Sequence, residues 1–338
     1  MEIRKNVSLK NYNTFGIDVT AEQFVEVSTL AEVEEVAGDS SFDIDKTLII
    51  GGGSNILLTQ NVSGLVVKNN LKGVEVVKET GDHVYVKFMA GEVWHDAVLY
   101  CVNNGYAGIE NLSLIPGLCG AAPMQNIGAY GVELVNVFDQ LEAFNYNSKQ
   151  FEIFNKEACE FGYRESVFKK RLKNKYLICS ITLKLNKQPT FNVDYGAIQQ
   201  TLEANNVKDL SIKAISDAVI QIRQSKLPNP AELGNSGSFF KNPEIEQDAF
   251  DKLIADYPNA PHYPLANGKV KVPAGWLIEQ CGWKGKRVGN TGAHKNQALV
   301  LVNYGNATGN EIHHLALEIK QSVKQKFGVD IEPEVNVV

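Results

Sequence analysis

The chain has 338 residues, a length that predicts about two to three domains around a substantial core and excludes a small disulfide-held scaffold. Its 33 lysines and arginines against 39 aspartates and glutamates give a net charge of −6, which excludes a global basic surface for nucleic acid or anionic membrane. No run of 18 apolar residues occurs, and the N-terminus lacks an apolar segment before a cleavage site, so we expect a soluble, cytoplasmic protein.

The first half of the chain predicts a mixed pattern of helices and strands. Thr29 to Glu32 forms a capping-box pattern that opens a short helix ending at Gly38, and a buried strand is expected at 47–50. A second helix is expected over 92–104, ended by Gly105. Apolar or alternating segments bounded by Gly and Asn predict further strands at 65–69, 74–79, 83–88, 140–146, 151–155 and 176–185. The middle of the chain is therefore mostly sheet.

The character of the sequence changes after residue 211. Helical patterns are expected at 211–226, 244–257 and 274–281. A longer helix should begin at Thr308, again with a capping box, and end at Gly328, before a last strand that we expect to join the mid-chain sheet. The fold class is α+β, and the expected domains are 1–70, 71–212 together with 328–338, and 213–327.

The cysteines and histidines indicate neither disulfides nor a metal site. An odd number of cysteines without a C-x-x-C pair fits a reducing compartment. His313 and His314 are adjacent, and adjacent helical positions point about 100° apart, so the two rings cannot chelate one ion.

Two glycine-rich segments carry the first chemical signal. The segment LIIGGGSNILL places glycines directly after a strand, where backbone N–H groups can approach phosphate oxygens. A tight turn between two strands would explain the same segment. It matches neither the G-x-G-x-x-G dinucleotide pattern nor a P-loop. The segment 114–134 has small residues and one charge, which suits close approach to a flat ring system but also fits a buried crossover loop.

A set of motifs carries a resemblance to a known family. The motifs NTFG, GGGSN, PGLCGAAPMQNIGAYG, YRES, GNSGSFFKNP and EPEV follow one another along nearly the whole chain. In this order they resemble the bacterial UDP-N-acetylenolpyruvoylglucosamine reductases, the MurB family, in its long form (type I). The resemblance implies noncovalent FAD held by two subdomains of the vanillyl-alcohol-oxidase (PCMH) type, and a separate substrate-binding domain.

The resemblance also implies a reaction and a set of FAD-binding residues. The family reduces UDP-N-acetylglucosamine enolpyruvate to UDP-N-acetylmuramate with NADPH, a step of peptidoglycan synthesis and so of cell-wall biogenesis, cell shape, the cell cycle and cell division. Cys119 and Met124 depart from the residues expected in the cofactor loop. The implied FAD-binding residues are Gly51, Gly52, Gly53, Ser54, Asn55, Pro116, Gly117, Gly120, Ala121, Gln125, Asn126, Gly128 and Arg223.

Three residues are expected to act on the reacting group. By the resemblance, Ser238, not Ser236, delivers the proton. Arg164 is expected to hold the substrate carboxylate, because a guanidinium forks two donors onto two oxygens, although a surface ion pair with Glu165 or Glu160 would also explain it. Glu334 would donate to the enolate as a neutral acid, since a nearby negative charge disfavours its ionised form. Glu332, two positions away, is the confusable carboxylate.

The substrate-binding residues are expected on several segments. Lys226 could meet a diphosphate or simply compensate a helix C-terminus. Tyr195 lies in FNVDYGAIQQTL, which is similar to the insert of the long-form enzymes that closes over the nucleotide substrate. Tyr163, Asn242 and Gln280 complete the expected substrate site.

Two other functions remain open from the sequence. One is another FAD oxidoreductase of the same fold with histidine-linked flavin, although no histidine occurs at 13–68 or 109–131. The other is a sugar-nucleotide-binding protein without turnover, which would be colourless. We expect a monomer that binds a UDP-sugar and has no nucleic-acid, membrane or metal partner.

Overall fold

The computed structural model describes residues 1–40 and 42–338, and the chain divides into two compact units built from interleaved segments. Unit 1 consists of Met1–Val7, Thr20–Gly52 and Val62–Ser225, and unit 2 consists of Ser8–Val19, Gly53–Asn61 and Lys226–Val338. The domain boundaries expected from the sequence stay predictions.

The first sheet of unit 1 is largely parallel. Its strand order is β1-β2-β5-β3, and both β2 and β3 run parallel to β5. The strands are β1 (Arg4–Ser8), β2 (Thr20–Val27), β3 (Leu48–Ile50) and β5 (Val62–Asn69). Helix α1 (Leu30–Gly38) connects β2 to β3 and has the expected capping box, in which the Glu32 N–H donates to the Thr29 hydroxyl at 3.2 Å.

The second sheet of unit 1 is antiparallel, in the order β11-β10-β12-β7-β6. Its strands are β6 (Val74–Glu79), β7 (His83–Met89), β10 (Phe138–Asn145), β11 (Gln150–Asn155) and β12 (Tyr176–Asn186). Every second residue of β7 is buried and belongs to the same core cluster as the buried face of α2 (Trp94–Asn103). The alternate residues of β7 and the apolar face of α2 therefore pack into one core.

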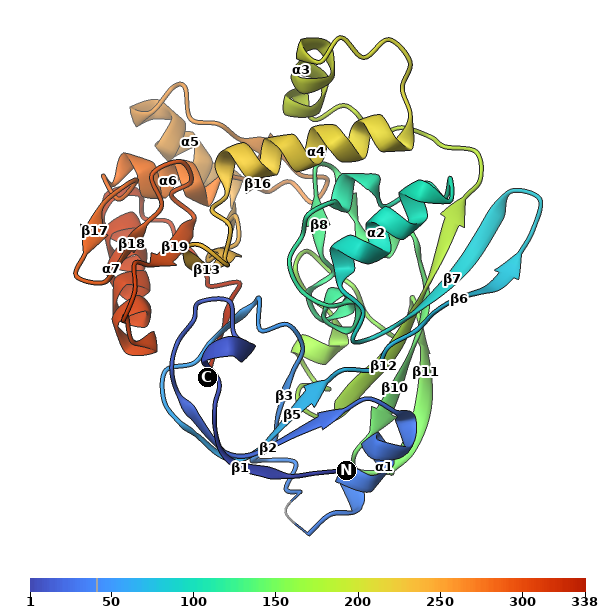
Figure 1. The fold of residues 1–338 in the computed structure, drawn as a ribbon. Coiled ribbons are helices and arrows are strands. Elements are labelled where there is room, and N and C mark those ends of the chain that lie inside the picture. The colour runs from blue at the N-terminus through green and yellow to red at the C-terminus, as the bar shows by residue number, and fades with distance from the viewer. Residues whose placement is uncertain (41) are drawn as a thin grey trace. The chain divides into compact units, whose positions relative to one another are not determined.

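The remaining elements of unit 1 are short or helical. They are η2 (Glu110–Leu112), η3 (Cys119–Gln125), β8 (Gly128–Ala129), β9 (Val132–Glu133), η4 (Leu134–Asn136), η5 (Val167–Lys169), α3 (Gly196–Ala204) and α4 (Ile212–Lys226). Figure 1 shows α3 beside the long helix α4. Ile198 and Leu202 of α3 form a separate apolar cluster with Ile215 and Val219 of α4.

Unit 2 contains two small antiparallel sheets and a parallel strand pair. The strand orders are β13-β19-β18-β17, β14-β16-β15 and β20-β4. The strands are β4 (Ile56–Leu57), β13 (Gly234–Ser238), β14 (Glu244–Ile245), β15 (Tyr263–Pro264), β16 (Val270–Lys271), β17 (Arg287–Val288), β18 (Thr291–Ala293), β19 (Val300–Asn303) and β20 (Asn336–Val337). The helical elements are η1 (Lys10–Tyr12), α5 (Gln247–Asp256), α6 (Ala274–Gln280) and α7 (Gly309–Phe327), and α7 lies along β18 and β19 (Figure 1).

Helix α7 confirms its prediction from the sequence. It has the Thr308–Glu311 capping box and ends at Gly328, whose φ of 69° is left-handed. Its buried stripe, Ile312, Leu315, Ile319 and Val323, enters the core of unit 2. No helix in the described parts of the chain is long and apolar enough to cross a membrane.

Two predictions about elements are corrected. The helix expected at 244–257 begins only at Gln247, because Glu244 and Ile245 pair with β16 as strand β14. The last strand does not join the mid-chain sheet, because Asn336 and Val337 instead pair in parallel with β4.

Candidate active site

The two glycine-rich segments meet within unit 1. A Cβ atom on Gly52 would lie 3.4 Å from the Gly117 Cα atom, and one on Gly51 would lie 3.6 Å from the Leu118 side chain. Within the described residues, the backbone N–H groups of Gly52 and Gly53 have no hydrogen-bond partner. Unpaired N–H groups beside glycine backbone fit the phosphates of a dinucleotide such as FAD.

The backbone conformation and the close neighbours of position 53 require a glycine there. Its φ is +64°, and a Cβ atom there would lie 2.1 Å from the Tyr12 carbonyl oxygen, a contact within unit 2. Its carbonyl also accepts from the Thr14 N–H at 3.1 Å, so the NTFG segment packs directly on this turn. The turn between β3 and β4 is therefore tight, as one interpretation of the sequence expected, and in the parts of the chain that the structure describes the fold does not use the N–H groups of the half-buried Gly52 and the buried Gly53.

We predict that Gly53→Ala lowers the melting temperature by several degrees, because left-handed backbone and a steric overlap each cost a non-glycine residue about 1–2 kcal/mol or more. The matched control is Gly51→Ala, whose Cβ meets only ordinary contacts at 3.6 Å or beyond. Thermal unfolding of both variants checks the prediction. Equal melting temperatures for the two variants would contradict it.

The second glycine-rich segment is held along the N-terminal end of α2. The Trp94 N–H donates to the Gly117 carbonyl at 3.0 Å, and the Gly120 N–H donates to the Ala90 carbonyl at 2.9 Å. Pro116 and Ala121 are exposed, and Gln125 is half-buried. Burial raises the pKa of the Cys119 thiol, so this departure from the family pattern places a neutral, buried sulfur in the loop, while Met124 is half-buried.

Asn126 is buried and fully engaged with the protein. Its side-chain amide donates to Glu133 at 3.0 Å and to the Gly162 carbonyl at 3.1 Å, and its Oδ1 atom accepts from the Val135 N–H at 3.0 Å. Its φ of 45° is left-handed. Its N–H also donates to the Pro123 carbonyl at 3.4 Å, so Asn126 holds the shape of the loop through both its side chain and its backbone.

The Arg164 side chain lies against Asn126 and Gly128 of the second glycine-rich segment and not on the surface. Its guanidinium donates to the Gly128 carbonyl at 2.6 Å and to the Asn126 carbonyl at 3.4 Å, and lies 3.6 Å from a Glu133 carboxylate oxygen. It also lies 5.2 Å from the centre of the Tyr163 ring.

The carboxylates suggested as surface partners of Arg164 have other ion pairs. Glu160 pairs with Arg171 at 2.6 Å, and Glu165 pairs with Lys170 at 2.6 Å. Glu133 was not among the residues expected in the site, and its only signal in the sequence is that it is the one charged residue of the segment 114–134.

Strained backbone collects around this loop. Leu114, Asn126, Tyr130 and Arg164 all have positive φ, between 45° and 57°. Such conformations are rare for residues other than glycine and concentrate where a structure holds a functional geometry. The four residues therefore mark the 114–131 segment and YRES as the candidate site of unit 1.

In unit 2 the backbone of Glu334 pairs with the segment that contains Ser238. The Glu334 N–H donates to the Phe239 carbonyl at 2.8 Å, so the residue after Ser238 pairs with Glu334 on the neighbouring extended segment. The Asn55 side chain donates to the Glu334 carbonyl at 3.3 Å, which adds the end of GGGSN to the same cluster. Glu332 is exposed and pairs with Lys241 at 2.7 Å, as expected for a surface carboxylate.

The two serines of GNSGSFFKNP differ in their surroundings. Ser236 is buried, and its hydroxyl lies 3.5 Å from the Ile56 carbonyl. Ser238 is half-buried, and no described residue forms a hydrogen bond with its hydroxyl. Phe239 and Phe240 are fully buried and belong to the core of unit 2, so packing explains both rings.

The other expected substrate-binding residues have different surroundings. Asn242 accepts from the Ala274 N–H at 2.9 Å, at the start of α6. Gln280 and Lys226 are exposed at the ends of α6 and α4. Tyr195 is 46% exposed and precedes α3, and its ring packs edge-on against Tyr130 with centres 5.2 Å apart.

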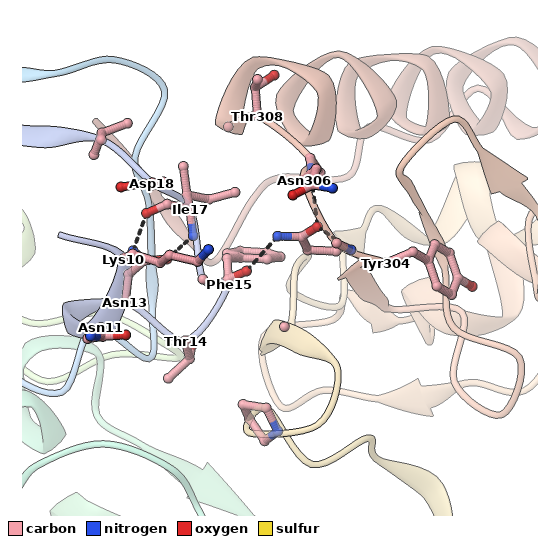
Figure 2. A pocket seen from close by; sticks show the side chains of 18 of the residues that line it. Lys10, Asn11, Asn13, Thr14, Phe15, Ile17, Asp18, Tyr304, Asn306 and Thr308 are labelled. Atoms are coloured by element: carbon pink, nitrogen blue, oxygen red, sulfur yellow. Dashed lines mark hydrogen bonds between the residues drawn. The ribbon is translucent and has the colours of Figure 1, made fainter. Parts of the chain in front are cut away.

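A pocket of about 1130 Å³ in unit 2 contains none of the expected site residues. In Figure 2 it lies between Asn13, Phe15 and Ile17 on one side and Tyr304, Asn306 and Thr308 on the other. The Asn13 amide is bonded to Leu9 and Ile17, and the Asn303 amide donates to the Phe15 carbonyl at 2.9 Å. These side chains serve the fold, which explains the NTFG motif as a structural one.

Comparisons with known proteins agree along the whole chain. Residues 229–338 match the C-terminal domain of UDP-N-acetylenolpyruvoylglucosamine reductase, and residues 21–152 match an FAD-binding domain. The chain is 52% identical to the UDP-N-acetylenolpyruvoylglucosamine reductase of Amoebophilus asiaticus and 49% identical to that of Flavobacterium johnsoniae, covering 100% of each chain. Its fold is similar to that of the crystal structure of this reductase from Thermus caldophilus, with a TM-score of 0.67, 23% identity and 99% of both chains covered.

Proposed function

The chain belongs to the UDP-N-acetylenolpyruvoylglucosamine reductase family, and on this premise we propose that it reduces UDP-N-acetylglucosamine enolpyruvate to UDP-N-acetylmuramate with NADPH. FAD is its cofactor, and FAD when bound supplies hydride to the vinyl carbon of the substrate. The observation that supports the proposal is the hydrogen bond from the Glu334 N–H to the carbonyl of Phe239, the residue that follows Ser238. The cytoplasmic location and the monomeric state expected from the sequence stay predictions.

The residues of this chain then have two tasks at the neighbouring carbon. Addition of hydride to the vinyl CH2 carbon leaves an electron pair on the carbon next to the carboxylate. The Ser238 hydroxyl delivers the proton to that carbon. The transfer is favourable because the carbon is a far stronger base than the alkoxide that the serine becomes, provided that the site keeps the two groups aligned. Glu334, on the segment that pairs with Phe239, supports the enolate by donating a hydrogen bond in its neutral form.

Arg164 holds the substrate carboxylate in this proposal. Its guanidinium is anchored by the Gly128 carbonyl at 2.6 Å, which fixes the direction of the fork. Tyr163 lies beside it, and Lys226 meets the diphosphate of the substrate. The residues proposed to hold FAD are those of GGGSN and the Pro116–Gly128 loop, together with Arg223.

The experiment that tests the function is anaerobic mixing with NADPH, followed by UDP-N-acetylglucosamine enolpyruvate. Loss of the visible flavin absorption in the first step and its return in the second supports the proposal. Return of colour with no sugar nucleotide but with another acceptor would indicate a different oxidoreductase. A colourless protein that takes up no FAD would indicate a binding protein without turnover.

Tyr195 is the residue we propose to close over the nucleotide. Its ring already rests against Tyr130 while remaining 46% exposed, so it can cover a ligand at small cost in packing. We expect Tyr195→Ala to raise KM for the UDP-substrate by about tenfold, the loss of roughly 1.4 kcal/mol of contact, and to leave reduction by NADPH unchanged. The matched control is Tyr263→Ala, at another exposed tyrosine. Steady-state kinetics decide the matter, and an unchanged KM would remove Tyr195 from the site.

A further inference from the structure

Leu114 is the strained residue just before the Pro116–Gly131 loop. Its φ of 57° is unfavourable for a bulky side chain. Its N–H donates to His95 Nδ1 at 2.9 Å, and its carbonyl accepts from Arg223 Nε at 3.2 Å. Side chains from α2 and α4 therefore hold both polar groups of this one peptide residue.

The neighbouring residues are held by other groups. Trp94 Nε1 donates to the Leu112 carbonyl at 3.0 Å, and the Ser113 hydroxyl donates to the Glu110 carbonyl at 2.7 Å. Leu114 is thus the last residue held by such hydrogen bonds before the Pro116–Gly131 loop begins. Near the other end of the loop, burial raises the pKa of the Tyr130 phenol, and the charge of Arg223 acts against this larger effect and lowers that pKa.

We propose that His95 is a positioning residue, which accepts the Leu114 N–H and thereby aims the Leu114 carbonyl at Arg223 and sets the start of the Pro116–Gly131 loop. The inference rests on the proposed function, in which this loop and Arg223 contact FAD. His95 itself does not touch the cofactor. Its effect on FAD passes through Leu114, because a strained peptide that loses one of its two holding bonds can relax to an ordinary conformation.

The protonation state of His95 follows from this geometry. Nδ1 can accept the Leu114 N–H only in the neutral ring, with the proton on Nε2. Burial lowers the pKa of His95 below its ordinary value of 6.5, Asp96 on the same helix raises it, and Arg223 from α4 lowers it. Since the pKa is lower in the folded protein, the hydrogen bond and its stabilisation are complete above pH 6.5. Both are lost as the pH falls through the lowered pKa.

A matched pair of variants tests the proposal. His95→Asn keeps an acceptor, because Asn Oδ1 occupies about the reach of His Nδ1, whereas His95→Leu is similar in size and has no acceptor. Release of FAD from the diluted holoenzyme is followed by the rise in FAD fluorescence. We expect His95→Leu to raise the dissociation constant for FAD about tenfold, the lower part of the usual range for leaving a donor unpaired, because the Leu114 N–H is partly buried. We expect His95→Asn to stay within about threefold of the parent. His314→Asn, at an exposed histidine of α7, should leave it unchanged.

The pH dependence gives a second readout that a purely structural role would not produce. The parent should lose FAD affinity as the pH falls through the pKa of His95, which burial lowers below 6.5, and His95→Asn should not, because its amide does not titrate in this range. Equal affinity of His95→Leu and the parent would overturn the proposal, as would the same pH profile in the parent and His95→Asn. If His95→Leu does not fold, the comparison of these two profiles decides alone.

One more variant distinguishes a failure of this inference from a failure of the proposed function. Ala121 is exposed in the loop, so Ala121→Trp should obstruct FAD without disturbing the core. Normal FAD binding by Ala121→Trp would show that the loop is not the cofactor site, and the function itself would need revision. Weak binding by Ala121→Trp together with normal binding by His95→Leu would reject only the role of His95.

Discussion

Ser238→Ala is expected to slow reduction of the enolpyruvyl substrate by roughly 10²–10⁴-fold, the usual range for loss of a general acid. Reduction of the bound FAD by NADPH should remain nearly unchanged, because that step needs no proton from this hydroxyl. The structural basis is the hydrogen bond from the Glu334 N–H to the carbonyl of Phe239 at 2.8 Å, which pairs the segment of Ser238 with that of Glu334. Rapid mixing of each half-reaction separately measures the effect.

Two further variants control this experiment. Ser236→Ala removes the other hydroxyl of the same strand, at a buried position that we assign to the fold, and should leave the ratio of the two half-reactions unchanged. Ser238→Cys should retain part of the activity, because a thiol also carries a transferable proton. Equal slowing of both half-reactions in Ser238→Ala would mean that the serine only shapes the site. No slowing would assign the proton to water or to another residue.

Arg164→Lys is expected to lower kcat/KM for the UDP-substrate by about 10–100-fold, because loss of one charge-assisted hydrogen bond costs roughly 1.5–3 kcal/mol. A lysine cannot both bond to the Gly128 carbonyl at 2.6 Å and present two parallel donors to a carboxylate. FAD should remain bound, since GGGSN is intact. Steady-state kinetics and the visible spectrum together measure the change.

Arg171→Lys is the matched control for Arg164→Lys. Arg171 is a short distance further along the chain, with 62% of its side chain exposed, and pairs with Glu160 at 2.6 Å on the surface. Exposed pairs of this kind contribute about 0–1 kcal/mol, so its replacement should leave kcat/KM within about twofold of the parent. Near-normal kcat/KM in Arg164→Lys as well would place Arg164 outside the site.

Local signals predicted the elements that depend on neighbouring residues. The capping boxes at Thr29 and Thr308 and the glycine end of α7 were readable because their hydrogen bonds join residues three or four positions apart. The strand at Glu244 and the partner of the last strand were not readable. Each depends on a segment distant in the sequence, β16 and β4 respectively, and no local pattern encodes that choice.

The candidate site likewise has features that the sequence predicts and features that it does not. The sequence by itself determined the family, the FAD cofactor and the chemical types in the motifs, because glycine, arginine, serine and glutamate each have a restricted chemistry. Only the tertiary structure decided that Gly52 meets Gly117, that the Glu334 N–H bonds to the Phe239 carbonyl, and that His95 accepts a hydrogen bond from Leu114. Each of these contacts joins residues that are distant in sequence, and each has a backbone group on at least one side, so the identity of the residues alone does not predict them.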